Sequence, residues 1–223
     1  MEFSRSLTSG EINMLQNIFG NSINYADVKI YNSSFDRGVS IDGNIGIPSD
    51  KYHPDFSTLE STKLADQALL IHEMTHVWQS QNGYEVLETG LTLQAMYESH
   101  RDDPTIANPY DYQLDPNKTF KDYNMEQQAS MMEDYFLTKD NINEDLKKLV
   151  EDFINSDQDG SWLPTQDAML QTWKNYLDNG GKWVFILDQL VAAHFPFNNI
   201  IDAVNELWKL ARSVDSSNIS PLV

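Results

Sequence analysis

Two histidines and a glutamate stand at a spacing that suits metal chemistry, in the segment His72-Glu73-Met74-Thr75-His76. At about 3.6 residues per turn, side chains four apart lie on one face of a helix, so both imidazoles could bind one ion at roughly 2.0 to 2.1 Å. Glu73 points about 100° away from His72, which keeps it off the ion but within reach of a water molecule beside it. The apolar periodicity of the flanking residues indicates a helix. The segment therefore predicts a metal-binding helix that also carries a general base.

The metal that suits such a pair of imidazoles is zinc (Zn²⁺), and a catalytic zinc site needs a third protein ligand and one open position. The chain contains no cysteine, which leaves His, Asp and Glu as its strong metal ligands and excludes disulfides and thiol catalysis. Glu98 follows His76 by 22 residues, and Glu126 follows it by 50. The spacing alone slightly favours Glu98 and leaves both carboxylates open. Further candidates are the other histidines, His53, His100 and His194.

A strong excess of acidic residues limits the partners of the chain. It carries 34 Asp and Glu against 15 Lys and Arg, a formal net charge of -19 and a pI near 4.4. This charge repels phosphate backbones and anionic membrane surfaces, so we expect no nucleic-acid partner. The sequence has neither a long apolar window nor a basic segment leading into one, so we expect no membrane insertion and no classical signal peptide. The expected location is the cytoplasm of the producing cell, with delivery by another route left open.

The periodicity of the chain predicts an α+β fold that is predominantly α-helical. A capped helix over residues 8–20 has Thr8 as its N-cap and Glu11 at the capping-box position. A strand over residues 28–31 and a hairpin over 39–47 form a small N-terminal β-sheet. The remaining apolar periods predict helices over residues 62–81, 84–97, 123–137, 142–154, 165–177, 183–193 and 198–214. Between them, a polar loop over residues 102–117 is long enough to be functional.

The length of 223 residues permits one or two closely packed domains. We expect a metallopeptidase-like core over residues 1–140, a helical C-terminal subdomain over 141–215 that packs on the core, and a flexible tail over 216–223. The sequence has no repeat, low-complexity tract or long linker that would mark a sharper boundary.

Two blocks of the sequence resemble proteins of bacterial contractile injection systems. Residues 7–20, 28–31 and 70–79 resemble the HExxH core domain of these systems, the eCIS core. They resemble still more the Vgr-related proteins that are often labelled type IV secretion protein Rhs. Residues 110–114 and 122–136 resemble a second block of those proteins. The resemblance covers roughly residues 7–136, and its most specific parts are the stretches HEMTHVWQ and NMEQQA.

The resemblance implies an effector or accessory factor of a contractile, type VI-like secretion system. The implied fold is a zincin-like core of the glu-zincin type, and the implied activity is that of a zinc metallopeptidase or amidase, a hydrolase of peptide or amide bonds. The implied partners are a protein, peptide or peptidoglycan-peptide substrate and either a VgrG-like spike component or an immunity protein. The alternative is a non-catalytic zinc-binding scaffold or adaptor that docks a spike component.

The resemblance also changes the ranking of the third ligand, because it implies that the Glu of the second block, Glu126, completes the site with His72 and His76. Neighbours that could then orient the ligands are Asn124, Gln127 and Asp134. The eCIS core family often carries Asp four residues after this Glu, where the present chain has Ser130. The carboxylate that orients an imidazole is therefore open, with Asp134 as one candidate.

If the site is catalytic, Glu73 is the expected general base, which takes a proton from water and passes it to the leaving nitrogen. A tetrahedral intermediate needs a further hydrogen-bond donor, for which Tyr110, Tyr112 and His100 are candidates and Tyr112 is our choice. The strand over residues 44–47 is the expected edge for pairing with an extended peptide substrate.

Overall fold

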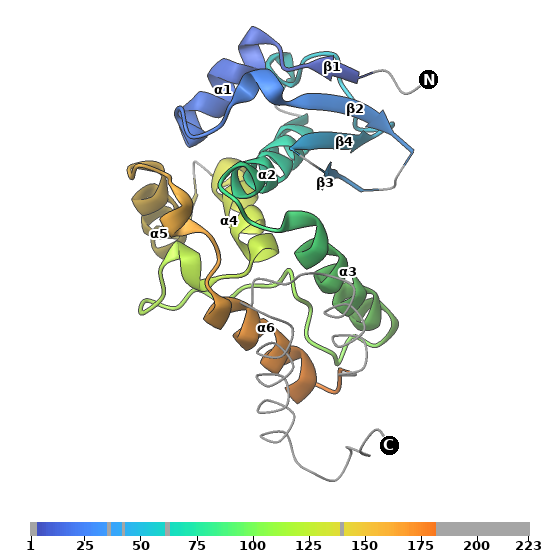
Figure 1. Ribbon diagram of the computed structural model, residues 1–223, viewed down its shortest axis with the longest axis vertical. Coiled ribbons are helices and arrows are strands. Elements are labelled where there is room, and N and C mark those ends of the chain that lie inside the picture. The colour runs from blue at the N-terminus through green and yellow to red at the C-terminus, as the bar shows by residue number, and fades with distance from the viewer. Residues whose placement is uncertain (1–3, 35–36, 42, 61–62, 139–140, 182–223) are drawn as a thin grey trace.

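The computed structural model describes residues 4–34, 37–41, 43–60, 63–138 and 141–181. Within them the chain is mostly helical with one small sheet, which confirms the predicted α+β class. The strands are β1 (Ser4–Ser6), β2 (Lys29–Ser33), β3 (Val39–Ile41) and β4 (Asn44–Pro48). The main helices are α1 (Ser9–Phe19), α2 (Leu64–Gln81), α3 (Val86–Asp102), α4 (Met125–Leu137), α5 (Glu144–Ile154) and α6 (Gln166–Asp178). The strands gather at one end of the molecule, and α3 and α6 lie toward the other (Figure 1).

The predicted helices over residues 183–193 and 198–214 and the tail over 216–223 lie outside the described residues. In the described part, α3 continues five residues beyond the predicted end at Tyr97 and finishes at Asp102. None of the helices described there has the length and apolar composition that crossing a bilayer requires.

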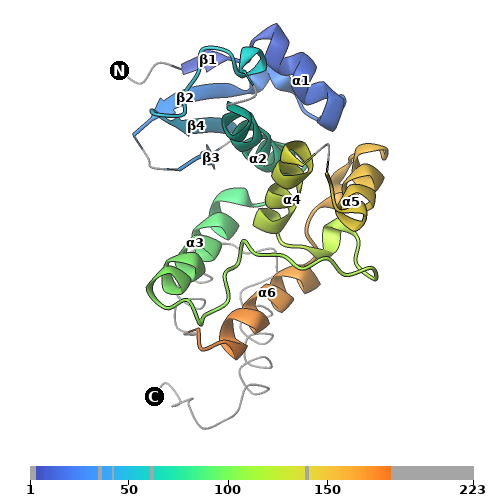
Figure 2. The ribbon, with the colours of Figure 1, turned by 180° about the vertical axis from the view of Figure 1, so that it is seen from behind.

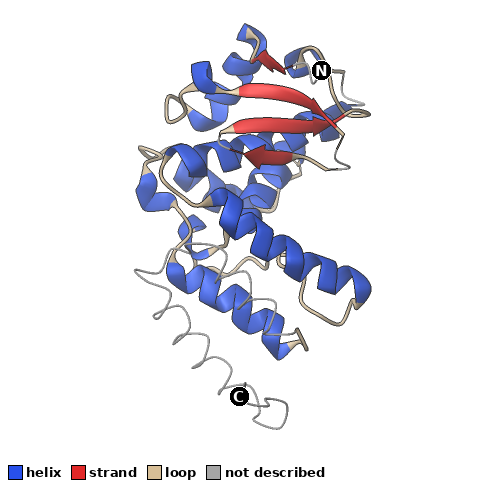
Figure 3. Cartoon of the chain, turned by 45° about the vertical axis from the view of Figure 1, so that its right-hand side comes forward, coloured by secondary structure: helices blue, strands red, loops and turns tan. Residues whose placement is uncertain are grey.

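The sheet has the strand order β1-β2-β4-β3 (Figure 3). Strand β2 pairs in parallel with β4, whereas the β1–β2 and β3–β4 pairs are antiparallel. The tight connection from β3 to β4 includes Gly43, whose φ of 73° suits glycine far better than other residues. Because β4 lies between β2 and β3, the expectation that residues 44–47 form an open edge is wrong. The edge belongs to the preceding strand of the hairpin, β3.

Two hydrophobic clusters hold the described helices together. The larger one joins α1, the sheet, α2, α4 and α5, with Trp78 and Phe153 among its fully buried members. The smaller one joins α3, α6 and the start of α4 around Trp173. Helices α5 and α6 therefore pack into different clusters, and the view from behind shows them on separate sides of the polar loop that precedes α4 (Figure 2).

Helix α2 is buried on most of its circumference, because the sheet, α3 and α4 all pack against it. It ends in a Schellman motif, in which the Gly83 amide donates to the Ser80 carbonyl and the Tyr84 amide donates to the Gln79 carbonyl. Gly83 has a φ of 90°, which this helix ending favours. The ending turns the chain into α3, which contacts α2 and lines one pocket together with His72, Glu73 and His76.

Candidate metal centre

The candidate metal centre forms where α2 and α4 pack together, since His72 and His76 come from α2 and Glu126 from α4. The start of α4 is fixed by Asn124, a fully buried N-cap that accepts hydrogen bonds from the amides of Glu126 and Gln127. The Asn124 side-chain amide also donates to the Pro109 carbonyl at 2.9 Å. Glu126 thus lies in the first turn of α4, where the helix dipole stabilises a negative charge.

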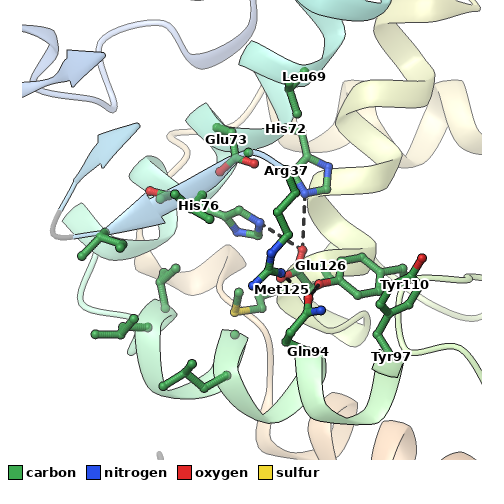
Figure 4. Close-up of a pocket in the computed structure, with 18 of the residues that line it drawn as sticks. Arg37, Leu69, His72, Glu73, His76, Gln94, Tyr97, Tyr110, Met125 and Glu126 are labelled. Atoms are coloured by element: carbon green, nitrogen blue, oxygen red, sulfur yellow. Dashed lines mark hydrogen bonds and ion pairs between the residues drawn. The ribbon is translucent and has the colours of Figure 1, made fainter. Parts of the chain in front are cut away.

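Both imidazoles converge on one oxygen of Glu126 (Figure 4). The Nε2 atom of His72 lies 3.3 Å from Glu126 Oε2, and the Nε2 atom of His76 lies 3.1 Å from the same oxygen. One ligand atom from each of the three residues fits within a span of 4.8 Å. Two nitrogens and one carboxylate oxygen at this spacing form a donor set that can hold one metal ion.

The outer nitrogen of each imidazole has its own partner. His72 Nδ1 lies 3.1 Å from Glu133 Oε2, and His76 Nδ1 lies 2.8 Å from Gln79 Oε1. A proton on each Nδ1 satisfies these oxygens, so that loss of the second proton from a ring leaves its Nε2 lone pair directed at the centre. Gln79 is held in turn, because its amide nitrogen donates to Gln128 Oε1 at 2.8 Å.

Burial and charge pairing have opposite effects on the pKa values of His72 and Glu126. Burial opposes the charge on His72, but hydrogen bonds to Glu126 and Glu133 outweigh it and raise the pKa of His72 to about 10. Burial also opposes the charge on Glu126, yet the imidazoles of His76 and His72 hold the pKa of that carboxyl well below its usual range. In the metal-free chain, the protonated imidazoles therefore balance the charge of the buried Glu126 carboxylate. A bound metal ion would take over this role.

Glu73 lies beside the cluster without joining it. Its side chain is buried, and its Oε2 atom has no hydrogen-bond partner in the part of the chain that the structure describes. Burial raises the pKa of Glu73, because the charged form is poorly solvated there. Gly38, just before β3, packs so closely that a Cβ atom on it would lie 2.3 Å from Glu73 Oε1. A carboxylate with an unused oxygen, next to two imidazoles, is placed to accept a proton from water.

The residues of the centre line a cleft of about 640 Å³. One wall is the edge strand β3, and the opposite wall is one face of α3, where lining residues recur every three or four positions. Three large apolar side chains that line the cleft are notably exposed: Ile41 on β3, and Leu87 and Leu91 on α3. Among the described residues, the cleft therefore combines a strand edge that no further strand pairs with, an apolar wall and the His-Glu cluster.

The structure separates the candidates that the sequence left open for the third ligand. Glu126 contacts both imidazoles, whereas Glu98 lies on α3, outside the cleft lining, where it pairs with Arg101 at 2.7 Å. His53 pairs with Asp66 at 2.7 Å and is not part of the cluster. His194 lies outside the described residues.

The structure also separates the three candidate donors for a tetrahedral intermediate. Tyr110 lines the cleft, and its hydroxyl lies 3.3 Å from Gln94 Oε1. The Tyr112 hydroxyl lies outside the cleft lining and donates to Asp134 Oδ2 at 2.5 Å. The His100 ring is also outside it, with Nδ1 at 2.5 Å from the Ile106 carbonyl. By position, Tyr110 rather than the expected Tyr112 faces the candidate centre.

Sequence reasoning missed several residues that shape the site. Glu133, not Asp134, contacts an imidazole, and it follows Glu126 by seven residues, the spacing of one helix face over two turns. The sequence therefore held enough information to place Glu133 on the same face of α4 as Glu126. Gln79 is three residues after His76, also within reach on one helix face. The contacts of Gly38 and Arg37 depend on how the hairpin packs on α2 and α3, so no local pattern could reveal them.

These features define a class of protein, a small α+β domain whose buried helix presents a His-Glu-x-x-His motif to a carboxylate from a second helix beside a cleft. No family model matches the chain. Over 149 residues it is 38% identical to the type VI secretion system spike protein VgrG2b of Pseudomonas aeruginosa, a match that takes in 64% of this chain and 14% of the spike protein. The solved effector domain of Pseudomonas aeruginosa VgrG2b has a TM-score of 0.52 and 33% identity to it, over 67% of this chain and 81% of that one. The chain belongs to the family of this effector domain.

Proposed function

We propose that this chain is a zinc-dependent peptidase with a zincin-like core that acts as an effector of a type VI secretion system. The observation that carries the proposal is the convergence of two Nε2 atoms on Glu126 Oε2 in a cleft, beside the Glu73 carboxylate, whose Oε2 has no hydrogen-bond partner among the described residues. A metal ion and a general base are the two requirements for hydrolysis of an amide bond by this route. Membership in the family of the VgrG2b effector domain supports the link to secretion.

The residues present fit zinc. Among the described residues, two imidazole nitrogens and one carboxylate oxygen leave a fourth position open, which is the pattern of catalytic rather than structural zinc sites. Glu133 and Gln79 supply the outer contacts that hold such imidazoles in place. When bound there, zinc would lower the pKa of a water molecule and polarise the carbonyl group of the bond to be cleaved.

Glu73 performs the proton transfers in this proposal. It takes a proton from the attacking water as the new C–O bond forms, and it delivers that proton to the leaving nitrogen as the C–N bond breaks. Its burial strengthens it as a base, because a poorly solvated carboxylate holds a proton more tightly. The contact with Gly38 limits the positions that the carboxylate can take.

The cleft supplies contacts for an extended peptide. The free edge of β3 offers backbone groups for strand pairing with the substrate main chain. Leu87 and Leu91 on the opposite wall would receive a large apolar side chain of the substrate, which buries their exposed surface. Tyr110 is the proposed donor to the oxyanion of the tetrahedral intermediate, since burial raises the pKa of Tyr110 and keeps its hydroxyl protonated.

The proposed partner in delivery is a VgrG-like spike component, and the proposed route out of the producing cell is the type VI apparatus. The chain corresponds to a small part of the VgrG2b spike protein, so a larger assembly is the natural setting for such a domain. The negative net charge of the chain repels nucleic acid and anionic membranes. Protein or peptide targets are therefore favoured.

Metal analysis combined with a cleavage assay tests this function. Purified wild type, Glu73→Gln, His76→Ala, Glu126→Gln and Glu98→Gln are compared for bound zinc by mass spectrometry and for cleavage of a proteome-derived peptide mixture. We expect one zinc per wild-type chain, strong loss in His76→Ala and Glu126→Gln, and no change in Glu98→Gln. Glu73→Gln should keep its zinc and its unfolding temperature while cleavage falls by about 10²- to 10⁴-fold.

The outcomes separate the proposed function from its alternatives. Bound zinc without cleavage of peptides or peptidoglycan fragments would favour a non-catalytic scaffold or adaptor that docks a spike component. Failure to bind zinc even after reconstitution would refute the metal-dependent mechanism. Unchanged cleavage in Glu73→Gln would show that the base has been wrongly assigned.

A further inference from the structure

Arg37 occupies an unusual place for a cation in this acidic chain. It stands directly before Gly38 and the edge strand β3, and it is the one Lys or Arg among the described residues that line the cleft. Its side chain runs across the cleft from the hairpin to α3, where the guanidinium donates to the amide oxygen of Gln94 (Figure 4). The residue is exposed, so a bound molecule can reach it.

The other described arginines are engaged by carboxylates. Arg5 forms two hydrogen bonds to the buried carboxylate of Glu11, at 2.8 and 2.6 Å, and Arg101 pairs with Glu98 at 2.7 Å. Among the described residues, Arg37 has no such ion pair, and its partner is a neutral amide. A guanidinium binds a carboxylate more strongly than it binds an amide, because both partners of the pair are charged.

The carboxylates nearest the metal centre do not satisfy Arg37. Glu126 and Glu133 contact the imidazoles, and Glu73 packs against Gly38. A carboxylate that enters the cleft away from the metal centre needs a cation to offset its lost hydration. Among the described lining residues, Arg37 is the one Lys or Arg that can supply that charge.

We infer that Arg37 is a specificity-determining residue that binds a carboxylate of the substrate near the scissile bond, with Gln94 holding the guanidinium ready. The inference rests on the proposed function, because it places a peptide along β3. The carboxylate could belong to an Asp or Glu side chain or to the free C-terminus of a peptide. Either group would exchange the amide contact of Arg37 for a charged, bidentate one.

Binding to matched peptide pairs tests the inference without requiring turnover. A peptide array carries pairs that are identical except for Asp or Glu against Asn or Gln, and a second set that differs only in a free or amidated C-terminus. The full chain is applied both zinc-loaded and after dialysis against a chelator, so that coordination of the carboxylate to metal is separated from its contact with Arg37. We expect the carboxylate members to bind about tenfold more tightly in at least one set, and that set identifies the source.

Substitutions assign the preference to Arg37. Arg37→Gln should abolish the difference within pairs, Arg37→Glu should reverse it, and Arg37→Lys should retain part of it, because a single ammonium replaces the planar fork. Arg101→Gln is the matched control, since Arg101 is exposed and lies outside the cleft lining. Equal unfolding temperatures would establish that the exposed substitutions leave the fold intact.

No difference between pair members in wild type, or an unchanged difference in Arg37→Glu, would overturn the inference. Its failure is distinguishable from failure of the proposed function, because the array reports binding and the peptide-mixture assay reports cleavage. A chain that cleaves peptides without carboxylate preference refutes only the role of Arg37. A chain that binds carboxylates through Arg37 and cleaves nothing refutes only the peptidase.

Discussion

Glu133 and His72 form a contact that sets the orientation of the candidate metal centre. Glu133 Oε2 lies 3.1 Å from His72 Nδ1, while Glu126 Oε2 lies 3.3 Å from Nε2 of the same ring. One imidazole is thus held between two carboxylates that stand two turns apart on α4. Such an outer carboxylate fixes the ring and its tautomer and increases the basicity of the inner nitrogen.

Glu133→Gln is therefore expected to weaken zinc binding by roughly 10- to 100-fold while leaving the three direct ligands in place. Competition with a chromophoric chelator measures this affinity. Asp134→Asn is the matched control, because the Asp134 carboxylate accepts the Tyr112 hydroxyl instead of an imidazole. Equal zinc affinities in Glu133→Gln and wild type would mean that the ring is oriented by packing alone.

Gly38→Ala tests the packing that positions the general base. The added Cβ would lie 2.3 Å from Glu73 Oε1 and 3.0 Å from Leu69 Cδ1, distances that force the carboxylate or the hairpin to move. Because a displacement near 1 Å at a reacting group can cost about 10²-fold, we expect cleavage to fall by about that factor while zinc content stays at one per chain.

Gly160→Ala is the control for this substitution, since its new Cβ would have no contact closer than 3.5 Å and lies outside the cleft lining. Cleavage by Gly160→Ala should match wild type. Full activity in Gly38→Ala would show that the proposed base tolerates displacement and would count against its role.

Local sequence patterns predicted the parts of the fold that depend on neighbours in the chain. The Thr8 and Glu11 capping box is present at the start of α1, and the His72 and His76 spacing places both rings on one face of α2. These features follow from the geometry of a single helix, which the order of residue types determines. The fold class followed from the same periodicities.

Patterns of this kind could not predict contacts between distant elements. In the described residues, the parallel pairing of β2 with β4 leaves β3 as the edge strand of the hairpin, and nothing in the hairpin sequence distinguishes its two strands in this respect. Arg37 meets Gln94 across 57 positions of the chain, and the candidate metal-binding cluster spans 50 positions from His76 to Glu126. Resemblance, rather than spacing, pointed to Glu126, because a third ligand from another helix has no fixed sequence separation.

Tyr110→Phe and Tyr112→Phe distinguish the two tyrosines as donors. Tyr110 lines the cleft, so loss of its hydroxyl should lower kcat by roughly 10²-fold with little change in KM. Tyr112→Phe removes a hydrogen bond to Asp134 and should cost about 1 kcal/mol of unfolding free energy without affecting kcat. Steady-state kinetics on one peptide cleaved by wild type measures both. The opposite pattern would return the donor role to Tyr112.

The pH dependence of zinc binding follows from the charge balance of the metal-free cluster. Hydrogen bonds to Glu126 and Glu133 overcome the effect of burial and raise the pKa of His72 to about 10, above its ordinary value of 6.5. A raised pKa means that His72 keeps its proton through neutral pH, so a metal ion must displace that proton before it can use Nε2. The apparent affinity for zinc should therefore increase as the pH rises from 6 to 8.5, and zinc binding should release protons.

Calorimetry at pH 7 in buffers of different ionisation enthalpy counts the released protons, and competition with a chelator at each pH gives the affinity. Glu133→Gln is the informative comparison, because removal of one carboxylate lowers the pKa of His72 and should reduce both the proton release and the slope of affinity against pH. Heats that do not depend on the buffer, together with a flat affinity profile, would show that the imidazoles are already neutral in the metal-free chain. Such heats would also mean that Glu126 has no proton to release, so its buried carboxylate would be charged without the countercharge described here.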